Sequence, residues 1–281
     1  MMPIDREKIL SLPDRITHHT YTKRDTILYA LGVGAESLEH VYEARLKALP
    51  TMAVILGYPG FDFWQAPEMG VDWKRLLHGE QSLELYQELP LEGDVTGRTR
   101  IVDILDKGAD KGAVAFLERL IETPEGELIA TVRSTSFLRG DGGCGGPSSN
   151  SARPHVPPDN RAPTHAIETR TASNQALLYR LSGDLNPVHI DPECARQSGF
   201  PGPILHGLCT YGIVGRALLE TVGREGATSL TRLDARFSSP VFPGETLTTL
   251  VWDEGNGRFG FNCFVVDRGV QVLSNGYAEV S

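Results

Sequence analysis

Two ionisable side chains five positions apart, Asp184 and His189, stand in a segment that cannot form regular helix. Ser182-Gly183 and Asn186-Pro187 are typical turn dipeptides, so both side chains belong to a loop with a tightly framed backbone. Such a loop can aim a carboxylate and an imidazole at one point, as general acid–base catalysis requires. The structural alternative is a turn cap and a packed or surface histidine. The close spacing of Gly, Asp, Asn, Pro and His favours chemistry.

A second candidate group is a backbone amide at the start of an apolar helix. Pro201 and Pro203 interrupt the chain just upstream, so the helix is predicted to begin at His206-Gly207. The first N–H groups of a helix lack partners within it and lie at the positive end of its dipole. Because Gly207 has no Cβ, a ligand carbonyl could approach its N–H as in an oxyanion hole. Close packing is the alternative reason for a glycine there.

The elements around these groups follow from hydrophobic periodicity. The first half is predicted to form a helix over residues 24–46, interrupted at Gly32 and Gly34. Four strands are predicted after it, at 80–88, 96–106, 112–121 and 127–138. The second half predicts a strand at 166–171, helices at 174–181 and 207–222, and strands at 229–238, 246–252, 258–266 and 270–280. The helix at 207–222 is apolar on nearly all sides, which indicates burial, and its small residues let a sheet approach closely.

A segment rich in Gly, Ser and Pro, residues 139–163, divides the chain. It predicts a linker between an N-terminal domain at 1–138 and a C-terminal domain at 164–281. It also contains a GxGxxG pattern at 140–145. That pattern carries little weight, because Gly146-Pro147-Ser148 follow where a dinucleotide site needs a helix.

The two halves have the features of a duplication. Tyr29-Ala30-Leu31 lies 150 residues before Tyr179-Arg180-Leu181, and Gly93 and Gly244 follow similar residues at nearly the same offset. At this offset Asp184 corresponds to Gly34, and His189 corresponds to Glu39. The first copy therefore lacks the acid–base pair, and it has no long apolar helix. One half is predicted to be catalytic and the other adapted to a different task.

Composition excludes several functional classes. The chain of 281 residues has a net charge of −9 at pH 7, which disfavours nucleic acid as a partner. No run approaches the roughly 18 apolar residues that a membrane span needs. The four cysteines are scattered without a CxxC pair, so neither a zinc site nor a disulfide framework is expected. We expect an intracellular protein, cytoplasmic or peroxisomal, without a recognisable signal peptide or peroxisomal tripeptide.

The central stretch resembles the signature of the MaoC-like (R)-specific 2-enoyl-CoA hydratases. The resemblance rests on YRLSGDLNPVHIDP at 179–192 and ILHGL at 204–208, and it extends to LHGEQ at 77–81, IVDILDKG at 101–108 and ARFSSPVFPG at 235–244. It is similar to the two-domain eukaryotic form found in the multifunctional enzyme of peroxisomal β-oxidation. It implies an α+β double hot-dog fold, in which two antiparallel sheets each curl around a helix. The N-terminal helix would be reduced, which makes room for a bulky acyl chain.

Carried over by position, the resemblance implies roles for individual residues. Asp184 and His189 match the catalytic pair, Asn186 should orient the site, and Gly207 matches the backbone donor to the thioester carbonyl. The positions that the family uses to contact acyl-CoA are His78, Gly79, Lys107 and Phe237. A lysine in an acidic protein suits CoA phosphates, although a turn lysine commonly has no such role. The linker departs from the family pattern.

The resemblance implies reversible hydration of trans-2-enoyl-CoA to (3R)-hydroxyacyl-CoA in fatty-acid metabolism. We expect a homodimer without a metal or redox cofactor, CoA being part of the substrate. Asp184 would help take a proton from water and His189 would deliver one to C2, a division left open because coupled groups need not have separable roles. The alternatives are a hot-dog acyl-CoA thioesterase and a non-catalytic acyl-CoA-binding module. A metal site at His189 and Asp191 is disfavoured, because only these two ligands are close in sequence.

Overall fold

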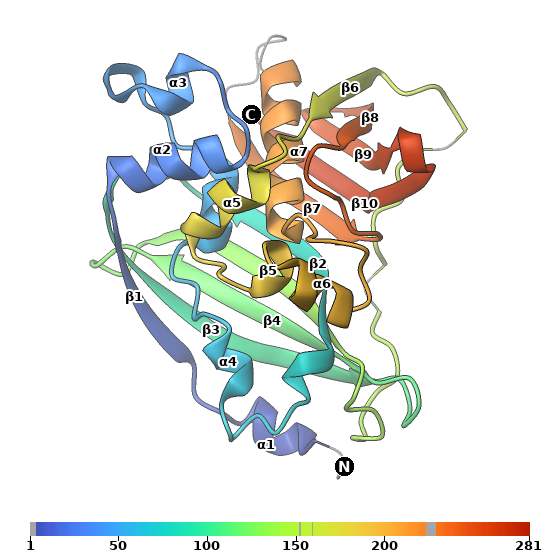
Figure 1. Cartoon of the computed structure of the whole chain (residues 1–281). Coiled ribbons are helices and arrows are strands. Elements are labelled where there is room, and N and C mark those ends of the chain that lie inside the picture. The colour runs from blue at the N-terminus through green and yellow to red at the C-terminus, as the bar shows by residue number, and fades with distance from the viewer. Residues whose placement is uncertain (1–3, 152, 159, 223–228) are drawn as a thin grey trace.

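Ten antiparallel strands form one sheet in the computed structural model of the protein (Figure 1), which describes residues 4–151, 153–158, 160–222 and 229–281. The first half contributes five strands in the order β1-β3-β4-β5-β2: β1 (Arg15–Tyr21), β2 (Leu76–Leu85), β3 (Gly93–Asp106), β4 (Ala113–Glu122) and β5 (Leu128–Leu138). The second half contributes five in the order β6-β8-β9-β10-β7: β6 (His165–Arg170), β7 (Leu230–Phe237), β8 (Thr246–Gly255), β9 (Arg258–Val265) and β10 (Val270–Val280). The second order repeats the first with every number raised by five, which is the topology of a duplicated unit.

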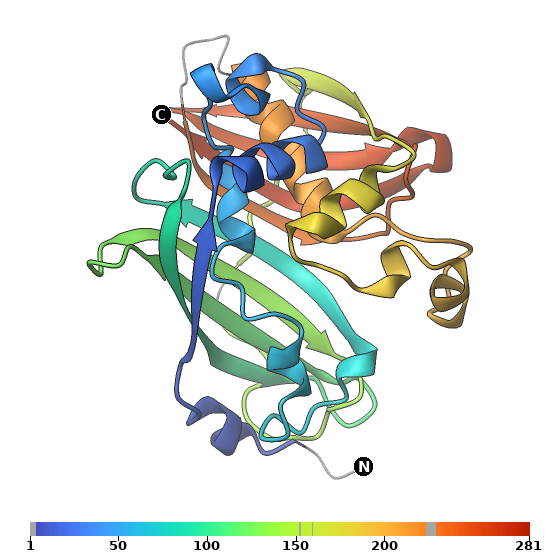
Figure 2. The same ribbon diagram turned by 60° about the vertical axis from the view of Figure 1, so that its left-hand side comes forward.

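The two five-stranded sheets are continuous. β2 and β7 pair from Glu80 opposite Arg236 to Glu84 opposite Arg232, and Figure 2 shows the two halves side by side along this junction. The predicted pair of sheets is therefore one ten-stranded sheet. Each of these strands would otherwise expose an unpaired edge, which pairing with the other half removes. With this amendment the predicted double hot-dog fold is confirmed.

The long helix of the second half is α7 (Gly207–Val222), with the bounds predicted from the sequence. Its glycines permit close approach on two sides. A Cβ built on Gly212 would lie 2.6 Å from Val33 Cγ1, and one built on Gly215 would lie 2.6 Å from Thr51 Cγ2 and 2.9 Å from Leu233 Cδ2. The predicted close contact with a sheet therefore holds at Gly215, whereas Gly212 meets the end of a helix of the first half.

The first half has no counterpart of comparable length. Its described helices are α1 (Arg6–Leu10), α2 (Lys23–Gly32), α3 (Leu38–Val41), η1 (Glu43–Arg45), η2 (Pro50–Ile55), α4 (Asp62–Gln65) and η3 (Trp73–Arg75). The six-residue η2, which is largely buried, packs against α7. The expected reduction of the N-terminal helix is thus seen directly. The remaining helices of the second half are α5 (Gln175–Tyr179), η4 (Arg180–Ser182), η5 (Pro187–His189), α6 (Pro192–Gln197) and η7 (Val266–Arg268).

The segment 139–163 has no helix or strand among its described residues, yet it is anchored. The Asp106 carboxylate at the end of β3 accepts from the N–H groups of Gly143 and Gly145, both at 2.8 Å. The Pro147 carbonyl accepts from the Asp106 N–H at 2.9 Å. The segment therefore follows the β3–β4 turn before it reaches the second half. No helix of the described residues is long and apolar enough to cross a membrane.

Candidate active site

The loop that carries Asp184 is held by its own side chains. Gly183 ends η4 with φ of 114°, a left-handed conformation that glycine adopts without strain. The Asp184 carboxylate accepts from the Asn186 N–H at 3.1 Å, and the Asn186 side chain accepts from the Val188 N–H at 3.2 Å. These turns place His189 at the end of η5. Asn186 thus shapes the loop, while a role toward substrate stays a prediction.

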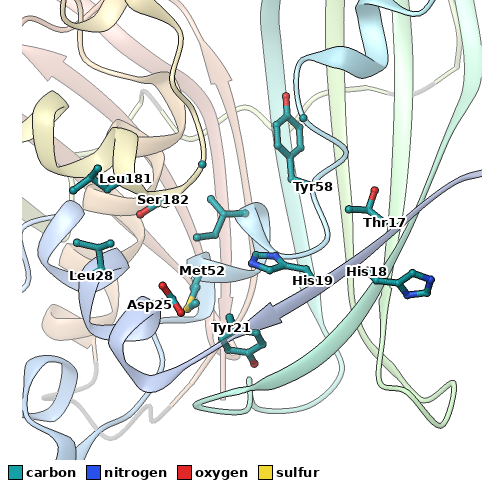
Figure 3. A pocket seen from close by; sticks show the side chains of 13 residues that line it. Thr17, His18, His19, Tyr21, Asp25, Leu28, Met52, Tyr58, Leu181 and Ser182 are labelled. Atoms are coloured by element: carbon teal, nitrogen blue, oxygen red, sulfur yellow. The ribbon is translucent and has the colours of Figure 1, made fainter.

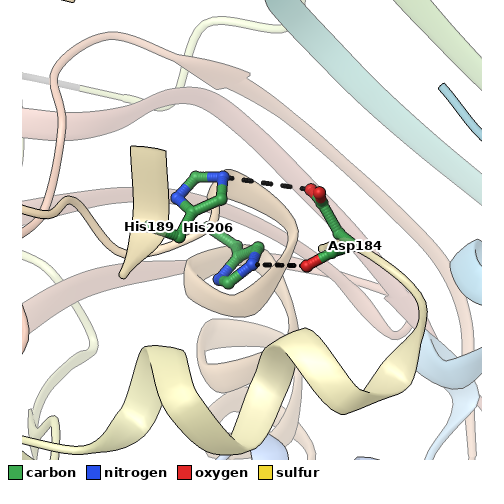
Figure 4. Close-up of side chains that lie close together, drawn as sticks. All are labelled: Asp184, His189 and His206. Carbon is green, nitrogen blue, oxygen red and sulfur yellow. Dashed lines mark hydrogen bonds and ion pairs between the residues drawn. The ribbon is translucent and has the colours of Figure 1, made fainter. Parts of the chain in front are cut away.

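Asp184 and His189 point toward each other (Figure 4). Asp184 Oδ2 and His189 Nε2 are 3.9 Å apart, too far for a direct hydrogen bond. His189 Nδ1 donates to the Ile204 carbonyl at 2.8 Å, so the neutral ring carries its lone pair on Nε2, toward Asp184. One water could therefore donate to both groups at once.

Burial sets the resting charge of His189. Its side chain is 10% exposed, whereas that of Asp184 is 45% exposed. Burial lowers the pKa of His189 below its ordinary value of 6.5, and the nearby Asp184 carboxylate partly opposes this shift. At neutral pH the resting pair is a neutral imidazole beside a carboxylate.

A third ring, His206, completes the site and was not among the predicted residues. It is stacked on His189, with ring centroids 3.7 Å apart and planes 26° apart. Its Nε2 donates to the backbone carbonyl of Asp184 at 3.1 Å. Burial, with a contribution from His189, lowers its pKa to about 4. In the sequence, only its place directly before Gly207 could have singled it out.

Three of the predicted residues lie near the junction of β2 and β7, where Gly207 lies against Phe237 and Phe237 against His78. A Cβ built on Gly207 would lie 3.2 Å from Phe237 Cε1, and the ring centroids of Phe237 and His78 are 4.8 Å apart. Burial lowers the pKa of His78 to about 4, and the Asp184 carboxylate partly opposes that shift. Gly79 follows at an irregularity of β2, where a Cβ would be 2.7 Å from Thr135 Oγ1.

Lys107 lies apart from these residues, in the turn after β3. Its Nζ donates to the Ser148 carbonyl of segment 139–163 at 2.6 Å. No hydrogen bond or ion pair of the described residues links it to Asp184, His189 or Gly207. Its contact with CoA stays a prediction.

A cavity of about 310 Å³ opens beside the loop that carries Asp184 (Figure 3). The second half contributes Leu181, Ser182 and Gly183, the last directly before Asp184. The first half supplies the rest of the wall: Thr17, His18, His19, Tyr21, Asp25, Leu28, Met52, Ile55, Tyr58 and Gly60. Burial and the Asp184 carboxylate both raise the pKa of Tyr58, so the charge of Asp184 acts on a residue that lines the cavity. The copy without an acid–base pair thus forms most of this cavity.

The first half has no comparable pair at the aligned positions. Gly34 carries no side chain, and Glu39 is exposed and forms an ion pair with Lys47 at 3.5 Å. The predicted loss of the dyad from the first copy is consistent with these surroundings.

The side chains of Asp184, His189 and His206 do not have the geometry of a metal centre. Asp184, His189 and His206 offer ligand atoms that all lie within 4.8 Å of one another. A metal ion lies near the plane of an imidazole that binds it, whereas the rings of His189 and His206 are stacked with centroids 3.7 Å apart, so their in-plane lone pairs do not converge on one ion. Asp191 instead caps α6 by accepting from the Glu193 N–H at 2.8 Å. That no metal takes part stays a prediction.

Comparison with known proteins adds the family. A MaoC like domain matches residues 155–275, and an MFE-2 hydratase 2 N-terminal domain matches residues 19–140. The 3-hydroxyacyl-thioester dehydratase Y of Mycobacterium tuberculosis is 45% identical over 252 residues, which cover 86% of this chain and 85% of that protein. The peroxisomal enoyl-CoA hydratase 2 of Arabidopsis thaliana is 38% identical over 94% of this chain and 91% of its own.

A solved structure agrees with these relatives. The crystal structure of a MaoC-like dehydratase from Phytophthora capsici is 37% identical, with a TM-score of 0.86 over 98% of each chain. The chain therefore belongs to the MaoC-like dehydratase family, in the form that carries an MFE-2 hydratase 2 N-terminal domain.

Proposed function

We propose that this protein hydrates trans-2-enoyl-CoA reversibly to (3R)-hydroxyacyl-CoA. The observation that carries the proposal is the Asp184–His189 pair, 3.9 Å apart and beside the N-terminus of a buried helix. The relatives are named for the two directions of one reaction, hydration of an enoyl-CoA and dehydration of a 3-hydroxyacyl thioester. The (3R) configuration rests on the resemblance of the central stretch to the (R)-specific enzymes.

The proposed position of the substrate relies on the start of α7 and on the cavity. The thioester carbonyl accepts from the Gly207 N–H, which stabilises the negative charge that develops when water adds to C3. A backbone donor of this kind is worth about 3 kcal/mol in the transition state. The acyl chain extends past Gly183 into the cavity between the halves.

The proton steps follow from the resting protonation of the pair. The bound water donates toward Asp184 Oδ2 and His189 Nε2, so its oxygen lone pair is free to attack C3. As the C3–O bond forms, the pair takes the water's proton and an enolate forms on the thioester. Nε2 of His189 then delivers that proton to C2, and the pair returns to its resting state. Atoms balance, since one water is added and no other proton donor is needed.

Substitution of the pair tests the reaction. Asp184→Asn and His189→Gln should each lower kcat for the loss of enoyl-CoA absorbance by about 10²- to 10⁴-fold, because each removes a proton acceptor. Asp191→Asn is the matched control, since Asn also caps a helix and the site lies only two residues from His189. It should leave kcat within about twofold.

Two outcomes would contradict the proposal. Release of free thiol without formation of a 3-hydroxyacyl-CoA would indicate a thioesterase. Acyl-CoA binding that survives both substitutions, with no turnover by the parent protein, would indicate a binding module. A homodimer, an acyl-CoA contact at Lys107, and a cytoplasmic or peroxisomal location are further parts of the proposal.

A further inference from the structure

His206 is a buried polar side chain that contacts both members of the proposed dyad. It is 1% exposed, stacks on the His189 ring, and donates to the backbone carbonyl of Asp184. On another side its ring lies 5.1 Å from that of Tyr179, itself buried. Its backbone directly precedes Gly207, the first residue of α7. One residue therefore connects the three groups that the proposed reaction uses.

The hydrogen bond fixes the tautomer of this ring. A carbonyl can only accept, so Nε2 of His206 carries the proton and Nδ1 of the neutral ring has a lone pair. Within the part of the chain that the structure describes, this buried Nδ1 has no hydrogen-bond partner. A buried polar atom without a partner carries a free-energy cost. An apolar aromatic ring would fill the same space without that cost, so packing alone does not explain a histidine here.

Among the described residues, few other hydrogen bonds hold the Asp184 loop. Its carboxylate is 45% exposed and accepts from Asn186, a residue of the same loop. The bond from His206 instead ties the Asp184 backbone to the start of α7. The His206 ring also packs against the ring of His189, whose orientation is otherwise set by its hydrogen bond to the Ile204 carbonyl.

We infer that His206 is a positioning residue, which holds the Asp184 backbone and the His189 ring in fixed relative positions. Asp184 Oδ2 and His189 Nε2 thereby keep the separation that one water bridges. The inference rests on the proposed hydration. His206 does not touch the reacting atoms in this account. Because burial and the neighbouring His189 lower its pKa to about 4, His206 is neutral at pH 7 and adds no positive charge next to His189 when that ring takes up a proton.

Two substitutions separate the hydrogen bond from the ring. His206→Gln retains an N–H donor near the place of Nε2, whereas His206→Phe retains the stacked ring and loses the donor. We expect His206→Phe to lower kcat by about 10- to 100-fold with KM within about twofold, because small misplacement of catalytic groups has effects of this size. His206→Gln should keep kcat within about tenfold of the parent.

The pKa of His189 provides a readout that does not depend on turnover. The Asp184 carboxylate raises this pKa, so displacement of the loop in His206→Phe should lower it, as measured by NMR titration of the histidines. His206→Gln should leave it near the parent value. His40→Phe is a matched control, since His40 is 7% exposed and its Nδ1 bonds the Lys47 carbonyl at 2.9 Å, away from the dyad. It should lower thermal stability without changing the pKa of His189.

The possible results decide the inference. Full kcat in His206→Phe, or equal losses in both variants that only follow their thermal stability while the pKa of His189 is unchanged, would overturn it. If the parent hydrates no enoyl-CoA, the proposed function fails. The NMR titration then still decides whether His206 positions Asp184 against His189.

Discussion

His189 works in this account as a neutral base at rest, and its surroundings explain why. Burial lowers its pKa, the carboxylate of Asp184 opposes that effect, and the Ile204 carbonyl fixes which nitrogen is free. The proton that reaches C2 is then the proton that the water gave up. The pair needs no proton from bulk solvent before the reaction begins.

The pH dependence of hydration follows from this protonation. A lowered pKa means that His189 stays neutral to a lower pH than an ordinary histidine. The acid limb of kcat/KM should therefore have an apparent pKa below 6.5, and hydration should reach its plateau above that value. A pH–rate profile between pH 4 and 8 checks this. Hydration that rises as pH falls through 6 would contradict the resting state proposed here.

The candidate site residues that lie close together in the sequence could be predicted from it. Asp184, Asn186 and His189 lie within six residues, and Gly207 follows two prolines. His206 was missed because its function comes from stacking on a ring 17 positions away, which no local pattern reports. Tyr58 was missed for the same reason, since only the fold brings it near Asp184.

Helix α7 is the element on which both halves converge, and its glycines make this possible. Gly215 lies against Thr51 of η2 and Leu233 of β7 at distances that exclude a Cβ without movement. The same helix presents Gly207 at its N-terminus to the proposed oxyanion. Packing along the helix and the position of its first amide are therefore linked.

Substitution at Gly215 measures this packing. Gly215→Ala adds a methyl group where neighbours are 2.6 and 2.9 Å away, and overpacking of this kind costs about 1–3 kcal/mol, partly offset by the better helix propensity of Ala. We expect a net loss of about 1–2 kcal/mol in the free energy of unfolding, measured by urea denaturation. Gly202→Ala is the control, because a Cβ there meets no atom within 4 Å. Equal stability of the two variants would contradict the close packing.

Most strands and helix α7 could be predicted because the periodicity of their hydrophobic residues is strong. The strands from β2 to β10 and helix α7 lie within a few residues of the predicted ranges. Strand β1 was not predicted, because RITHHTY is mostly polar and only Tyr21 in it is buried. The segment 139–163 reads as a free linker by composition, yet the Asp106 carboxylate holds it through backbone N–H groups, which composition does not report.

In the whole molecule, one site is shared by two copies of one topology. The second copy supplies Asp184, His189 and Gly207, whereas the first supplies most of the cavity wall. The pairing of β2 with β7 brings His78 to Phe237 beside the helix start. The first copy, with its shorter helices, thus borders a cavity in which we propose that the acyl chain binds.

The cavity predicts how chain length depends on the first half. Leu28→Trp should fill part of the space and lower kcat/KM for long-chain enoyl-CoA by about tenfold or more, while short-chain substrates are little affected. Leu31→Trp is the control on the same helix, since Leu31 is 42% exposed and does not line the cavity. Rates with a series of chain lengths measure the effect. Equal losses at every length would place the acyl chain elsewhere.

The central claim is that the Asp184–His189 pair adds water to one face of a trans-2-enoyl-CoA held at Gly207. The most direct measurement is the configuration of the 3-hydroxyacyl-CoA product, determined by chiral chromatography after incubation with enoyl-CoA of several chain lengths. We expect the (3R) product from the parent protein and none from Asp184→Asn. A (3S) product, or no hydration at any chain length, would contradict it.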